Sequence, residues 1–317
     1  MTRWSLILLS WVVVFLCEAA TLQEDFSSDP RTRGWQVSGD ASLFHWNSTN
    51  QDLEVTWNTE KTNSYFFHPL GNVLAKSDDF SVAFDLRLDD LNATFVNGYA
   101  FELSAGLLNR ADATGTNFNR SNGTQSPNLV EFDYFPDTGF GATISPAVVS
   151  SNSQFAVSFT FPLSLTQGDW FHIVMTYTAS NQTLVTTMTR NGGVFGPIKE
   201  VALDASFSDI HVDTLAVSSY RDNDADGSIL AHGLVDNFVV TMSDPPIQNL
   251  NGQLTNNVWQ VEFISRTNWL YTLERTEDFQ SWSAVSPQTG GVEGALMLCD
   301  TNTPSVKSFY RVYGQRP

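Results

Sequence analysis

The sequence predicts an all-β protein, an antiparallel two-sheet sandwich of the jelly-roll type. From residue 21 to about 241, short runs of alternating apolar and polar residues are separated by Asn, Asp, Gly and Ser. No stretch combines helical spacing of apolar residues with a capping signature. Such alternation gives each strand one packed face and one wet face, which antiparallel sheets permit. Runs of this number and length suit two packed sheets.

The first 20 residues are typical of a secretory signal peptide. Arg3 gives a short basic start, an apolar run extends from Leu6 to Leu16, and small residues follow at Ala19 and Ala20. This run is too short for a comfortable membrane span, and no later run is long enough. We therefore expect an exported protein, secreted or in the cell envelope, without a transmembrane span in the mature chain.

Four runs between residues 21 and 243 predict strands most clearly: Phe80–Leu88, Phe155–Phe161, Trp170–Tyr177 and Leu184–Thr189. The length of 317 residues allows one large or two moderate domains. Only Cys299 follows the predicted signal peptide, so no intramolecular disulfide is available to the mature chain. The formal net charge of -18 argues against nucleic acid and anionic membranes as partners.

One stretch, Asn128 to Asp137, alternates carboxylates with apolar residues. In an extended strand Glu131 and Asp133 point to the same face, about 7 Å apart. Two buried charges that close need a cation, a shared proton or exposure to water. Calcium suits such oxygen ligands, and Pro136 turns Asp137 back towards the same place. A partly solvated strand end with ordinary surface acids is the alternative, and spacing alone leaves both open.

This stretch, Glu131-Phe-Asp133-Tyr-Phe135-Pro-Asp137, resembles the metal-binding strand and turn of the legume-type lectins, in the concanavalin-like jelly-roll superfamily. The resemblance covers about residues 60 to 240. It implies that Glu131, Asp133, the Phe135 carbonyl and Asp137 are metal ligands. The family's further Asp and His are missing from residues 140–146, so it implies one Ca²⁺ at most. The family's loop with the sugar-binding Asp is also missing, so its monosaccharide site is not carried over.

A second acidic cluster, Asp222, Asp224 and Asp226 followed by Gly227, has the spacing of the first half of a calcium loop. An EF-hand would need a Glu at position twelve, where Gly233 stands, and flanking helices. The alternative is an exposed acidic hairpin turn.

Aromatic residues offer flat faces on which sugar rings stack. Tyr134 and Phe140, beside the predicted metal loop, are candidates for such a platform, together with Trp35, Trp46, Trp57 and Tyr65. Large aromatic residues in a β-sandwich also form its core, which is the alternative for each of them.

Catalysis is not predicted. Laminarinase-type glycoside hydrolases of the same superfamily use a second Glu after the Glu-x-Asp pair as proton donor. Here Phe135 and Pro136 occupy the positions for that Glu, and retaining hydrolysis needs both carboxyls. No catalytic residue is therefore assigned.

A Pro-containing linker at 244–250 separates the jelly-roll domain, 21–243, from a small β-domain at 251–317. The motifs Tyr271-Thr-Leu-Glu-Arg275, Phe279-Gln-Ser-Trp282 and Phe309-Tyr-Arg-Val312 resemble the small C-terminal β-domain of exported proteins of the Verrucomicrobia and relatives.

The leading hypothesis is a secreted, non-catalytic, lectin-like protein that binds a polysaccharide or cell-surface glycan, with calcium organising the loop at Asp137. A second hypothesis is a structural or adhesive surface protein without a sugar site. A third is a polysaccharide-degrading glycoside hydrolase whose acid lies elsewhere in the fold.

Overall fold

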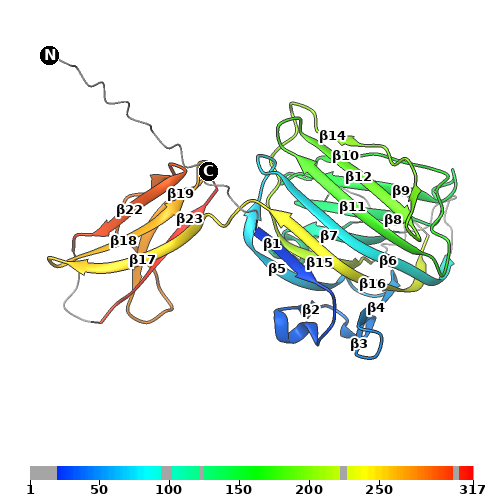
Figure 1. Ribbon diagram of the computed structural model, residues 1–317, viewed down its shortest axis with the longest axis horizontal. Helices are drawn as coiled ribbons and strands as arrows, with labels where there is room; N and C mark the ends of the chain where they lie inside the picture. The colour runs from blue at the N-terminus through cyan, green and yellow to red at the C-terminus, as the bar shows by residue number, and fades with distance from the viewer. Residues whose placement is uncertain (1–19, 94–101, 121–124, 222–226, 303–306, 317) are drawn as a thin grey trace, which may run out of the picture.

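In the computed structural model the described residues are 20–93, 102–120, 125–221, 227–302 and 307–316, and they form antiparallel β-sheets (Figure 1). This agrees with the predicted fold class. Two large sheets face each other to form the sandwich, and two smaller sheets form the C-terminal part. None of the described helices is long and apolar enough to cross a membrane.

The first large sheet has nine strands in the described part of the chain, with β6 and β16 at its centre. The first strand, β1, pairs with the last strand of the sandwich, β16, so the two ends of this domain lie together. In spatial order the main path is β13 (Gly193–Phe195), β12 (Thr183–Arg190), β11 (Trp170–Thr178), β6 (Phe80–Ala93), β16 (Ile229–Met242), β4 (Asp52–Asn58) and β3 (Phe44–Asn47). β1 (Ala20–Glu24) and β14 (Val201–Ala202) pair at its sides.

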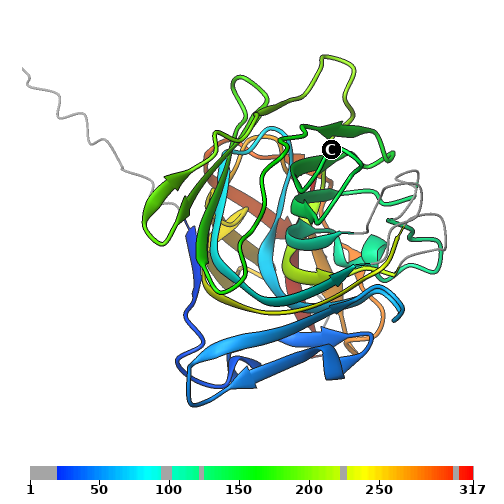
Figure 2. The same cartoon turned by 90° about the vertical axis from the view of Figure 1, so that its right-hand side faces the viewer.

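The second large sheet has seven strands among the described residues. Their order is β10 (Phe155–Val157), β9 (Thr143–Val149), β8 (Leu129–Phe135), β7 (Leu103–Leu108), β15 (Val212–Ser219), β5 (Ser64–Leu74) and β2 (Gln36–Ser38). Short helical turns are η1 (Pro30–Arg33), η2 (Ala41–Leu43) and α1 (Arg110–Ala113). Figure 2 shows the sandwich end-on, with the small domain behind it.

The strand β10 is shorter than the run Phe155–Phe161 predicted. It ends at Val157, and beyond it the pairing continues with one hydrogen bond from the Ser158 N–H to the Pro146 carbonyl and an isolated bridge between Ile144 and Thr160. The next partner in register would be Pro146 on β9, which has no N–H to donate to the ladder. The other three predicted runs lie in β6, β11 and β12.

The main core lies between the two large sheets. On β6 every second residue from Phe80 to Leu88 is buried, and on β8 the inward residues are Val130, Phe132 and Tyr134. The rings of Phe84 and Phe132 meet across the sheets with centroids 5.9 Å apart. Burying one such side chain stabilises the fold by about 1.5–3 kcal/mol. The same alternation turns Glu131 and Asp133 to the outer face of the seven-stranded sheet.

The C-terminal part has its own core of buried apolar residues from Val261 to Leu298. Its strands are β17 (Ile247–Thr255), β18 (Val258–Ser265), β19 (Leu270–Thr276), β20 (Ser283–Ala284), β21 (Thr289–Gly290), β22 (Gly294–Asp300) and β23 (Phe309–Gln315). β17 begins at Ile247, within the stretch expected to be a linker.

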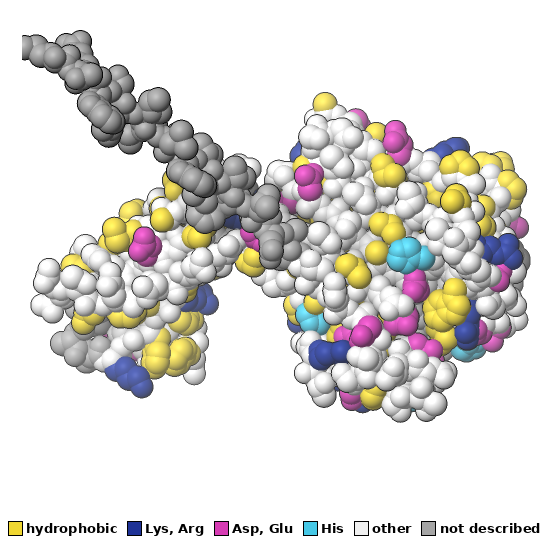
Figure 3. All heavy atoms as spheres, viewed as in Figure 1, with side chains coloured by type: hydrophobic (Ala, Val, Ile, Leu, Met, Phe, Trp, Pro, Cys, Tyr) yellow, Lys and Arg dark blue, Asp and Glu magenta, His cyan; other side chains and the backbone are white. Residues whose placement is uncertain are grey.

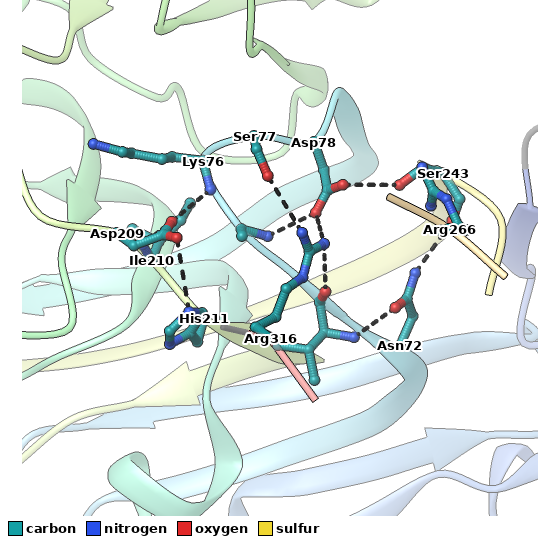
Figure 4. Close-up of polar contacts among 12 residues, drawn as sticks. Asn72, Lys76, Ser77, Asp78, Asp209, Ile210, His211, Ser243, Arg266 and Arg316 are labelled. Atoms are coloured by element: carbon teal, nitrogen blue, oxygen red, sulfur yellow. Dashed lines mark hydrogen bonds and ion pairs between the residues drawn. The ribbon is translucent and has the colours of Figure 1, made fainter. Parts of the chain in front are cut away.

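Arg316 joins this part to the sandwich (Figure 4). Its Nη2 donates to the Val73 carbonyl at 3.2 Å and pairs with Asp78, and its Nη1 donates to Ser77 Oγ at 3.3 Å. The guanidinium also lies over the Trp269 ring, 4.6 Å from its centroid. Both Arg316 and Asp78 are buried, so the pair is shielded from solvent.

Candidate functional site

The strand β8 carries Glu131 and Asp133 on the outer face of the seven-stranded sheet. Glu131 lies opposite Gly106 and Asp133 opposite Ser104 on β7. Each carboxylate is only 1% exposed, and Arg120, which follows α1 in the chain, lies against both of them. An apolar cluster that includes Tyr65 and Tyr220 packs beside them on the same face.

The guanidinium of Arg120 lies over this acidic pair. Its Nη2 donates to Asp133 Oδ2 at 2.5 Å, and its Nε lies 3.4 Å from Glu131 Oε2 and 3.2 Å from Glu102 Oε1. Tyr220 donates from its hydroxyl to Glu131 Oε1, and Ser104 Oγ donates to Asp133 Oδ1 at 2.6 Å. Both carboxylates of β8 therefore have a hydrogen-bond donor on each oxygen.

The charges in this cluster are strongly coupled. Burial, and then the nearby charge of Asp133, raise the pKa of Glu131 to about 7, while Arg120 and Tyr220 oppose the shift. Burial also raises the pKa of Asp133, against the effect of Arg120 and Ser104. Burial lowers the pKa of Arg120, but Glu102, Asp133 and Glu131 together raise it above its ordinary value. Arg120 therefore stays charged, and burial favours the protonated form of both Glu131 and Asp133.

The predicted calcium ligands do not come together as expected. Asp137 Oδ1 accepts from the backbone N–H of Gly139 at 2.8 Å and of Gly141 at 3.0 Å, so this side chain shapes its own loop. Phe135 ends β8. Within residues 20–93, 102–120, 125–221, 227–302 and 307–316, no three Asp, Glu, His or Cys side chains form a group that could hold a metal ion. Asp222, Asp224 and Asp226 lie outside the described residues.

Arg120 and Tyr220 were not predicted as site residues. A signal for Arg120 exists, since it is the only charged residue between Asp112 and Glu131. A lone cation in a polar loop, next to a strand with two acids on the same face, is a natural partner for them. Tyr220 carries no comparable signal, because its contact with Glu131 joins segments 89 residues apart.

A pocket lies beside this cluster, and we call it the loop pocket. Its volume is about 610 Å³. Two aromatic side chains, Tyr65 and Phe118, line it together with Arg221 and with amide and hydroxyl groups from Thr62, Asn63, Thr116, Asn117, Asn119 and Gln125. Phe118 stacks on Tyr220 with centroids 5.9 Å apart, and Tyr65 donates from its hydroxyl to the Ala113 carbonyl at 2.9 Å. The pocket wall thus rests on residues that contact the Arg120 cluster.

Of the six aromatic residues predicted to stack on sugar, the two beside the predicted metal loop differ in position. Tyr134 is 1% exposed and belongs to the core, because the even-numbered residues of β8 point inward. Its ring is therefore not available to a ligand at the surface. Phe140 is 66% exposed and stacks on Phe161, with centroids 5.2 Å apart.

The sequence matches no family model and no curated protein. Among solved structures, the chain is similar to peanut lectin with a nine-residue peptide, at 15% identity over 72% of this chain and 99% of that chain, with a TM-score of 0.43. Lectin UEA-II complexed with galactose is 14% identical over 71% and 99%, with a TM-score of 0.46. A legume lectin-like domain from Entamoeba histolytica is 9% identical over 69% and 95%, with a TM-score of 0.43. No site residue is transferred from these likenesses.

Proposed function

We propose that the protein binds carbohydrate without cleaving it, and that the loop pocket holds the sugar. The observation that carries this proposal is the lining of the pocket, which combines amide and hydroxyl side chains with the partly exposed ring of Phe118. Amides offer both donors and acceptors to sugar hydroxyls, and an aromatic face suits the C–H groups of a sugar ring. The volume of about 610 Å³ is within the usual range for a small-ligand site.

The state of the acidic pair favours binding over hydrolysis. A retaining glycosidase needs two carboxyls facing the scissile bond, about 5–5.5 Å apart. Glu131 and Asp133 are instead covered by Arg120, and their oxygens already accept from protein donors. Neither carboxyl belongs to the lining of the loop pocket.

The test is a glycan array followed by titration of the best ligand. We expect Asn117→Ala and Arg221→Ala to weaken binding about fivefold each, because one lost hydrogen bond costs about 1 kcal/mol and every 1.4 kcal/mol is tenfold. Gln253→Ala, an exposed amide on β17, is the matched control and should bind normally. Phe140→Ala tests whether its exposed ring extends the site. Unchanged affinity in both pocket variants would remove the loop pocket from the proposal.

A second candidate function, adhesion or scaffolding at a surface, is favoured by the C-terminal part. Ile264 and Met297 lie on neighbouring strands of its three-stranded sheet and are 39% and 57% exposed. Apolar side chains are visible on the surface of the small domain in Figure 3. If the array detects no glycan while Ile264→Ser with Met297→Ser reduces retention on cell envelopes, adhesion replaces carbohydrate binding.

Export through the N-terminal segment is part of the proposal. Its support is the basic start, apolar run and small residues of positions 1–20, which lie almost wholly outside the described residues. N-terminal sequencing of the protein recovered from the culture medium or the envelope tests it.

A further inference from the structure

Three carboxylates and one guanidinium are buried together on the outer face of the seven-stranded sheet. Glu102, Glu131 and Asp133 are each at most 2% exposed, and Arg120 is 7% exposed. Three negative charges without water require compensating positive charge. The guanidinium supplies one such charge at the centre of the group.

The geometry of Arg120 matches this task. A guanidinium is planar, always charged and carries five N–H donors, so one group can serve several carboxylates. Here Nε faces Glu102 and Glu131 while Nη2 bonds Asp133. The remaining oxygens of the β8 pair accept from Tyr220 and Ser104. A calcium ion would need six to eight oxygen ligands free of such donors.

The guanidinium places its positive charge against all three carboxylates, and the hydroxyls of Tyr220 and Ser104 donate to the remaining oxygens of Glu131 and Asp133. The strand pattern that resembles a metal site is therefore satisfied by groups of the chain itself.

We propose that Arg120 takes the place of a divalent metal ion in this fold, fixing residues 109–120 on the sheet and holding the wall of the loop pocket. The connection runs from Arg120 to Tyr220, whose ring centroid lies 6.0 Å from the guanidinium carbon, and from Tyr220 to the stacked ring of Phe118. On its other side Arg120 lies 5.5 Å from the centroid of Phe155. Ligand binding in the loop pocket is then independent of divalent ions, a consequence that rests on the function proposed above.

The first test is thermal unfolding of the purified protein in excess Ca²⁺, excess Mn²⁺ and EDTA. We expect one midpoint for the wild type in all three solutions. A rise of the wild-type midpoint in either metal that depends on Asp133, and so is lost in Asp133→Asn, would overturn the proposal.

The second test removes the cation. Arg120→Ala should lower the midpoint in EDTA by about 10 °C, because breaking a buried ion pair is costly and each kcal/mol shifts the midpoint by several degrees. Divalent ions should then raise the midpoint of this variant, since three carboxylates are left around an open space. Arg120→Lys keeps the charge and should lose less stability, without gaining a response to metal.

Arg190→Ala is the matched control, because Arg190 forms an exposed pair with Asp169 at the surface of the same domain. It should unfold nearly as the wild type does. An Arg120→Ala midpoint equal to that of Arg190→Ala would contradict the proposal. If Arg120→Ala does not fold, Arg120→Lys and the wild-type metal series still decide it.

Glycan binding with and without divalent ions is the third test. Glycan binding by the wild type should be the same in EDTA and in Ca²⁺. Loss of binding in EDTA at an unchanged midpoint would overturn the claim of metal-independent binding. If no glycan binds at all, the proposed function fails, whereas the unfolding experiments still test the role of Arg120.

Discussion

The buried carboxyl of Glu131 makes the stability of the fold depend on pH. Its pKa is raised to about 7 by burial first and by Asp133 second, with Arg120 and Tyr220 acting against the shift. The charged or titratable groups that interact with it are Asp133, Arg120, Tyr220 and Tyr65, and Glu102 contacts the same guanidinium. A carboxyl whose pKa is higher in the folded state stabilises the fold at low pH, and this contribution is lost as the pH rises.

We expect Glu131→Gln to change the pH profile of stability. In the wild type this stabilisation should be lost as the pH rises from the unfolded-state pKa of Glu131, near 4.5, to its folded-state pKa of about 7. The amide cannot lose a proton, so the stability of the variant relative to the wild type should rise across this window, by on the order of 3 kcal/mol. Urea unfolding of both proteins at pH 4.5 and pH 8 measures the difference. A constant difference over this range would show that Glu131 does not titrate there.

At the scale of elements, the β7–β8 pair sets the position of the acidic cluster. Gly106 allows close approach of the two strands, since a Cβ there would lie 2.3 Å from the Val130 carbonyl oxygen and 2.8 Å from Glu131 Cα. These are backbone atoms, which cannot move aside as the end of a flexible side chain can. The glycine therefore brings Glu131 and Asp133 under Arg120.

Gly106→Ala should destabilise the protein by about 2 kcal/mol, because the added methyl group must push the two strands apart. Gly294→Ala, where nothing lies within 4 Å of the added atom, is the control and should be nearly neutral. Chemical denaturation compares the two variants. Equal stability would mean that the strand pair adjusts without cost.

The strands were largely predictable from the sequence, whereas the centre of the candidate site was not. The alternation of apolar and polar residues predicted β6, β11 and β12. It also predicted that Glu131 and Asp133 lie on one face of their strand and Tyr134 on the other, which is the face that packs into the core. Arg120 lies in a segment without periodicity, so its contact with the pair depends on how that segment crosses the sheet. The strand β10 is shorter than its apolar run because Pro146 on β9 lacks the N–H that the next pair of the ladder needs.

At the scale of the whole molecule, the junction between the sandwich and the C-terminal part depends on few contacts. Arg316 contacts Asp78, Val73 and Ser77 of the sandwich and Trp269 of the C-terminal part. Asn72 Nδ2 adds a hydrogen bond to the Ser243 carbonyl at 3.2 Å. Small interfaces of this kind leave relative motion of domains as the default once a central contact is lost.

We expect Arg316→Ala to uncouple the two parts, because it leaves the buried Asp78 without its cation, at a cost of about 3 kcal/mol. Calorimetry should resolve two unfolding transitions instead of one, and limited proteolysis should cleave faster between residues 243 and 247. Arg311→Ala, which removes an exposed pair with Glu274 inside the C-terminal part, should change neither result. A single, unshifted transition in Arg316→Ala would show that other contacts hold the junction.

The contacts of Arg120 also bear on how the protein matures. A site built on a metal is finished only when the surroundings deliver the ion, and scarcity or competing chelators can leave part of the population incomplete. A guanidinium is synthesised with the chain, so the segment over the sheet can close in the same event as folding. Fresh protein should therefore reach its final form at the same rate in media rich or poor in trace elements.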